Sequence, residues 1–98
     1  MAFVQVIEFT TDNIDGVRAV GEEWEAASSG KRSATRRTLA EDHDRPGTYV
    51  MIVEFPSYEE AMANSQLPET QEFSGKMMQA AGGDAQFRNL DVVESRDL

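Results

Sequence analysis

Residues 49–61 read YVMIVEFPSYEEA and contain the most apolar run of the chain. The run from Tyr49 to Phe55 is rich in β-branched and aromatic residues, which favour a strand. Ser57 is followed three residues later by Glu60, and this pair forms a capping box that predicts a helix start. The stretch therefore predicts a buried strand that passes directly into a short helix over about residues 57–64.

The segment before this strand predicts its partner in a hairpin. Residues 32–40 alternate in the manner of a strand but are too polar for the centre of a sheet, so we expect an edge strand. Asp44-Arg45-Pro46-Gly47 lies between the two predicted strands, and its Pro and Gly favour a turn.

The N-terminal part predicts a central strand followed by a helix. Phe3 to Phe9 is apolar on both alternating faces except at Gln5 and Glu8. Thr10-Thr11-Asp12 offers helix caps, and we expect the helix to run to about Ser28. Its apolar stripe recurs at spacings of three and four residues and consists of Ile14, Val17, Val20, Trp24 and Ala27.

The C-terminal part predicts a second helical segment and a last strand. Pro68 suits the first position of a helix, and the last strand spans 86–93. The element order is β-α-β-β-α-β, which predicts a single α+β domain over residues 1–98. This order is typical of the ferredoxin-like arrangement, a four-stranded antiparallel sheet with both helices on one face.

Both faces of the predicted sheet are apolar, although one face of such a sheet ordinarily meets water. We assign the aliphatic set to the face under the helices: Val4, Val6, Val50, Ile52, Leu90 and Val92. The aromatic-rich set is then the face that meets a second copy: Phe3, Ile7, Phe9, Tyr49, Met51, Val53, Phe55 and Phe87. A chain of 98 residues without cysteine has little other means of adding buried surface, so we expect a homodimer.

Charge and composition limit the partners and the compartment. The net charge is −9, which disfavours binding to nucleic acid or to anionic membranes. The absence of cysteine and of a recognisable targeting segment predicts a cytoplasmic protein. Four of the nine basic residues fall within positions 31–37. This cluster is either a solvated strand edge or an anion site.

Several of these segments together resemble the dimeric α+β barrels, a superfamily that includes antibiotic-biosynthesis-type monooxygenases, haem-degrading enzymes and muconolactone isomerases. The resemblance is carried by the strand at 3–9, the strand-to-helix step at 53–61, the segment at 68–73 and the closing strand. It implies a fold, a dimer and a pocket in each subunit between the sheet and the helices, but no particular activity. Haem-binding members often carry a histidine in the segment that matches 64–68, and this chain has none there, so we expect no haem or other cofactor.

Few residues are candidates for chemistry. His43 is the only histidine and is flanked by Glu41, Asp42 and Asp44, which allows a metal ligand or a base. Charged loop tips commonly serve solubility, and we expect no metal. Four polar residues share the predicted aromatic face and are candidates for binding a small molecule: Gln5, Arg37, Tyr49 and Asn89. Alternatively, they pair with one another or lie in water at the open end of the barrel.

Three functional hypotheses follow. The first is a cytoplasmic homodimer that binds a small, partly aromatic molecule in the barrel pocket. The second is a cofactor-independent monooxygenase acting on a polyphenol or quinol. The substrate itself activates oxygen, so the protein requires few catalytic side chains. The third is a structural or assembly role without a ligand, in which phenylalanine and methionine side chains fill the pocket.

Overall fold

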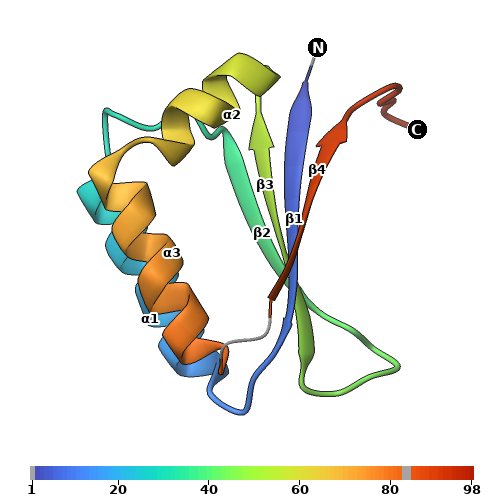
Figure 1. Ribbon diagram of the computed structural model, residues 1–98. Helices are drawn as coiled ribbons and strands as arrows, with labels where there is room; N and C mark the ends of the chain where they lie inside the picture. The colour runs from blue at the N-terminus through green and yellow to red at the C-terminus, as the bar shows by residue number, and fades with distance from the viewer. Residues whose placement is uncertain (1, 83–84) are drawn as a thin grey trace.

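A computed structural model describes residues 2–82 and 85–98 of the chain. Four strands form one antiparallel sheet in the order β2-β3-β1-β4, and three helices cover one of its faces (Figure 1). The elements in chain order are β1 (Phe3–Thr10), α1 (Ile14–Ala27), β2 (Arg36–Glu41), β3 (Thr48–Phe55), α2 (Tyr58–Ser65), α3 (Pro68–Ala80) and β4 (Ala85–Asp91). The ferredoxin-like α+β fold is confirmed, with the second helical region divided in two.

The division of the second helical region follows the sequence signals. Ser57 caps α2 by accepting a hydrogen bond from the backbone N–H of Glu60 at 3.2 Å. Pro68 occupies the first turn of α3, where a missing N–H costs nothing. The two helices therefore begin where the sequence predicts. Figure 1 shows α2 across the end of the sheet where β3 finishes, and α1 and α3 side by side along it.

The start of α1 differs from the prediction. The N-cap is Asn13, whose side chain accepts from the backbone N–H of Gly16 at 3.1 Å. Thr11 instead joins two elements, because its hydroxyl accepts from the N–H of Asn13 and donates to the carbonyl of Ala80. The predicted cap at residues 10–12 was thus placed one residue too early.

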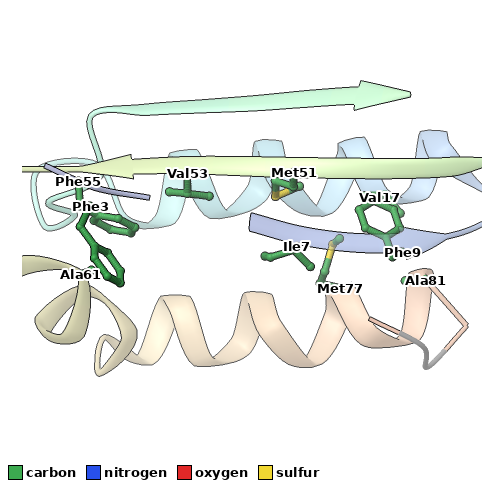
Figure 2. Packing of buried hydrophobic residues seen from close by; sticks show 10 residues of the cluster. All are labelled: Phe3, Ile7, Phe9, Val17, Met51, Val53, Phe55, Ala61, Met77 and Ala81. Carbon is green, nitrogen blue, oxygen red and sulfur yellow. The ribbon is translucent and has the colours of Figure 1, made fainter. Parts of the chain in front are cut away.

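The assignment of the two sheet faces was wrong, because the aromatic face lies under the helices. Figure 2 shows Ile7 and Phe9 of β1 and Met51 of β3 packed with Val17 of α1 and Met77 of α3. The other buried residues of this core are Phe3, Val53, Phe55, Ala61 and Ala81.

The physical reason for this allocation is the size of the side chains that the helices contribute. At the core, the helical regions supply three small side chains, Val17, Ala61 and Ala81, and one long side chain, Met77. Long phenylalanine and methionine side chains from the sheet are needed to fill the space that such small residues leave, since cores pack large against small.

The aliphatic set lies on the sheet face that none of the helices in the described residues covers. Its central members are only partly buried, and Leu90 is exposed. Ion pairs lie at both ends of this open face: Arg36 with Glu54, and Glu8 with Arg45 and Arg88. Within the described ranges, no helix is long and apolar enough to cross a membrane.

Candidate functional site

Two of the four predicted site residues meet directly on the helix-facing side of β1 and β4. Gln5 and Asn89 are register partners, and Gln5 Nε2 donates a hydrogen bond to Asn89 Oδ1 at 3.3 Å. Phe87 lies two residues before Asn89 on the same strand face and is 55% exposed. An exposed aromatic ring therefore lies next to an amide pair.

A second exposed aromatic residue borders this pair at its other end. Tyr58, in the first turn of α2, meets the ring of Phe3 edge-on with 5.4 Å between the ring centroids. Phe3 lies two residues before Gln5 on β1, about 7 Å away along the strand. We call the row formed by Tyr58, Gln5, Asn89 and Phe87 the aromatic–amide strip.

The strip is open because β4 forms an edge of the sheet that the helices do not cover. Six of the seven residues of β4 are exposed, and only Ala85 is partly buried. Aromatic residues are enriched at protein interfaces relative to the rest of the surface.

Tyr49 lies on the same sheet face but in a different place. It pairs in register with Phe9, and the two rings stack at 5.9 Å between centroids. Desolvation raises the pKa of its phenol, and the nearby Glu41 carboxylate raises it further. The phenol is therefore held neutral at the end of the sheet away from Phe3.

Arg37 lies at the opposite edge of the sheet, on β2. Its guanidinium binds Glu25 of α1, with Nε and Nη2 at 3.2 and 2.5 Å from the same carboxylate oxygen. Three strand spacings separate β2 from β4, which is about 14 Å. The structure thus places all four predicted residues on one face but brings only Gln5 and Asn89 together.

Asn64 is a polar residue that was not among the predicted site residues. It is 5% exposed and lies on α2 three residues after Ala61, on the same helix face as that core residue. Within the described part of the chain, its Oδ1 is buried without a hydrogen-bond partner. An amide that interrupts the apolar face of a short helix was the signal that could have identified it.

The space under the centre of the sheet is filled by the chain itself. Met51 and Met77 are fully buried there, and Phe3, Phe9 and Phe55 are 2–3% exposed. The aromatic–amide strip lies beside this packed interior, at the β4 edge.

His43 lies exposed in the loop between β2 and β3. Among residues 2–82 and 85–98, no group of three or more histidine, cysteine or acidic side chains could hold a metal ion.

Comparison with known proteins gives similarity in structure only. No protein-family model matches the sequence, and no curated protein matches it. A variant of SnoaB, described as a cofactor-independent oxygenase from Streptomyces nogalater, superposes with a TM-score of 0.80 at 14% identity, over 96% of this chain and 95% of SnoaB.

The chain has the fold of antibiotic-biosynthesis-monooxygenase-type proteins. A structure described as an antibiotic biosynthesis monooxygenase has a TM-score of 0.71 at 19% identity, covering 96% of this chain and all of that one. Rv0793 from Mycobacterium tuberculosis has a TM-score of 0.78 at 12% identity, over 99% and 100% of the two chains. The resemblance seen in the sequence is confirmed as one of fold.

Proposed function

We propose that this chain binds a small, hydroxylated aromatic molecule at the aromatic–amide strip and oxygenates it without a cofactor. The observation that carries the binding step is the hydrogen-bonded pair of Gln5 and Asn89 between two exposed aromatic residues. Aromatic rings bind planar ligands by stacking or edge contacts, and amides add directional hydrogen bonds.

The amide pair matches a phenol or quinol in hydrogen-bonding capacity. The contact at 3.3 Å uses one N–H of Gln5 and one oxygen of Asn89. The Asn89 NH₂ group and the Gln5 carbonyl oxygen have further capacity, so they can donate to one ligand oxygen and accept from one hydroxyl. Phe87 supplies the neighbouring apolar contact.

The oxygenation step is favoured by the similarity to SnoaB and to a protein described as a monooxygenase. A quinol can supply all the electrons itself: 1,4-dihydroxynaphthalene and O₂ give 2-hydroxy-1,4-naphthoquinone and water. One oxygen atom enters the ring, the other becomes water, and the four electrons come from the substrate. The protein then has to orient the ring, which two aromatic side chains and an amide pair can do.

We further propose that the protein works in the cytoplasm as a homodimer formed through the open sheet face. That face presents five aliphatic side chains that the subunit itself does not cover: Val4, Val6, Val50, Ile52 and Leu90. A second copy of the sheet is the simplest cover for such a self-complementary face.

Thermal unfolding with 1-naphthol and with naphthalene tests the binding step. We expect 1-naphthol to raise the Tm of the wild type more than naphthalene does, because only the phenol meets the amide pair. Asn89→Ala should abolish the difference. Gln86→Ala removes an amide from the opposite face of the same strand and should preserve it. Equal stabilisation of all three proteins by 1-naphthol would contradict a site at the strip.

Labelled oxygen tests the oxygenation step. With ¹⁸O₂ and 1,4-dihydroxynaphthalene, we expect enzyme-dependent formation of 2-hydroxy-1,4-naphthoquinone that carries one ¹⁸O atom. Simple autoxidation gives unlabelled 1,4-naphthoquinone and hydrogen peroxide instead. If the protein binds 1-naphthol but only these autoxidation products form, the chain is a binding protein and the oxygenation step is wrong.

A further inference from the structure

We propose a second ligand site, at the β2 edge of the sheet beside α1, that binds the oxyanion group of a small molecule, a carboxylate or a phosphate. The site is a hollow of about 220 Å³ whose lining includes Trp24, Glu25, Arg32, Arg36 and Arg37. It lies across the sheet from the aromatic–amide strip, so it is independent of the function proposed above.

Arg37 is held in an unusual position for a residue of an edge strand. Its side chain is only 16% exposed and lies against the backbone of α1. A Cβ atom at Gly21 would lie 2.6 Å from Nη1 of Arg37, closer than any ordinary contact. Glycine in the interior of a helix is unfavourable, and here its absent side chain provides the space for the guanidinium.

Arg32 is fixed at the same hollow by three contacts with α1 and its C-terminal end. Nη1 donates to the carbonyl of Glu25 at 2.7 Å and to the hydroxyl of Ser28 at 3.2 Å. The guanidinium carbon lies 5.5 Å from the centroid of the Trp24 ring, a cation–π distance. Two guanidinium groups are thus positioned before any ligand arrives, which lowers the entropic cost of binding.

Glu25 occupies the place of the anion in the free protein. Both nitrogens of Arg37 contact a single oxygen of this carboxylate, whose side chain is 46% exposed. Such partly exposed ion pairs are weak, and Glu25 can rotate into water. A ligand oxyanion that takes its place gains bidentate geometry with Arg37 and the added charge of Arg32.

The local charge also distinguishes this hollow from the rest of the surface. Two arginine side chains, Arg32 and Arg37, and one glutamate, Glu25, meet at it, in a chain whose net charge is −9. A small anion that is repelled elsewhere is attracted here over short range.

Fluorescence of Trp24, the only tryptophan, reports on the hollow directly. The wild type is titrated at constant ionic strength with cyclohexanecarboxylate, with inorganic phosphate, and with chloride as the control. We expect a saturable change with at least one oxyanion and none with chloride; the arm that saturates identifies a carboxylate or a phosphate as the ligand group. If neither oxyanion saturates, the proposal is wrong.

Four variants test the residues. Arg37→Gln should weaken binding about tenfold. Arg32→Gln should also weaken binding, and it provides the test if the Arg37→Gln protein does not fold. Glu25→Gln removes the internal competitor and should tighten binding severalfold. Arg96→Gln, an equal change of charge on the exposed C-terminal tail, should leave binding unchanged. Unchanged affinity in Arg37→Gln and Glu25→Gln, or an equal loss in Arg96→Gln, would overturn the assignment.

Discussion

Gly21 shows how a substitution can displace a neighbouring side chain without changing the fold. At Gly21, an added methyl group improves the helix propensity of α1 by about 1 kcal/mol. The nearest atoms to that methyl group would be those of the Arg37 guanidinium, the closest being Nη1 at 2.6 Å. We expect the guanidinium, which ends a flexible side chain, to move and the helix to keep its place.

For Gly21→Ala we therefore expect a free energy of unfolding within about 1 kcal/mol of the wild type. Oxyanion binding at the β2 edge should weaken, because Arg37 loses its position. Urea unfolding and the Trp24 titration measure the two quantities. A variant that binds the oxyanion as tightly as the wild type would show that the position of Arg37 is unimportant.

Glu69, in the first turn of α3, carries a pH dependence of stability. Its hydrogen bond with Lys31, at 2.8 Å, holds the pKa of the carboxyl below its usual value of 4.5. A lowered folded pKa contributes stability above the unfolded value, and this contribution is lost as the pH falls through the folded pKa.

We therefore expect Lys31→Gln to be less stable than the wild type at pH 7 and equal to it well below pH 4, in urea unfolding at each pH. Arg96→Gln serves as the matched control, since its exposed pair lies on the tail. A destabilisation by Lys31→Gln that is the same at both pH values would contradict the role assigned to this pair.

At the scale of elements, β3 shows which sequence signals suffice and which do not. Caps and turn residues predicted where two helices begin: α2 begins after Ser57 and α3 begins at Pro68. The strand predicted over 32–40 is shorter, because β2 begins only at Arg36. The same signals did not reveal which face of β3 meets the helices, because both parities are apolar. That choice depends on the small size of Val17 and Ala61 on the helices, a property of tertiary packing.

The candidate site was predictable only in part, because local patterns do not show how the elements pack. Gln5 and Asn89 came from strand parity, and the structure pairs them. Arg37 shares their parity, and its strand was expected at an edge of the sheet, but parity alone does not show that β2 and β4 lie at opposite edges. Asn64 was missed because a single amide on a short helix gives no spacing pattern, although its burial is clear once α2 is placed.

Met51 tests the corrected face assignment. Its side chain is fully buried in the subunit core, so Met51→Ala should lower the free energy of unfolding by about 2–5 kcal/mol. Urea unfolding measures this loss. A cost below about 1 kcal/mol would mean that Met51 does not belong to a packed core.

At the scale of the whole molecule, the open face is the feature that a single subunit leaves unexplained. Ile52 follows Met51 in the chain but lies on that face and is partly buried there. We expect sedimentation of the wild type to show a dimer of the 10.9 kDa chain, and Ile52→Asp to shift the protein to the monomer.

The Ile52→Asp monomer should keep its circular dichroism spectrum, because the residue is outside the subunit core. A wild type that sediments only at 10.9 kDa, or an Ile52→Asp protein that remains dimeric, would refute an interface on the open face.

The aromatic–amide strip is proposed to bind an aromatic molecule between Phe87 and Tyr58, on the amide pair. The most direct test is a titration of the ¹⁵N-labelled protein with 1-naphthol, followed in ¹H–¹⁵N correlation spectra. We expect saturable shifts of the Gln5 and Asn89 side-chain amide signals, with those of Asn13 and Gln86 unchanged. Shifts confined to other residues, or no saturable shift at all, would contradict the claim.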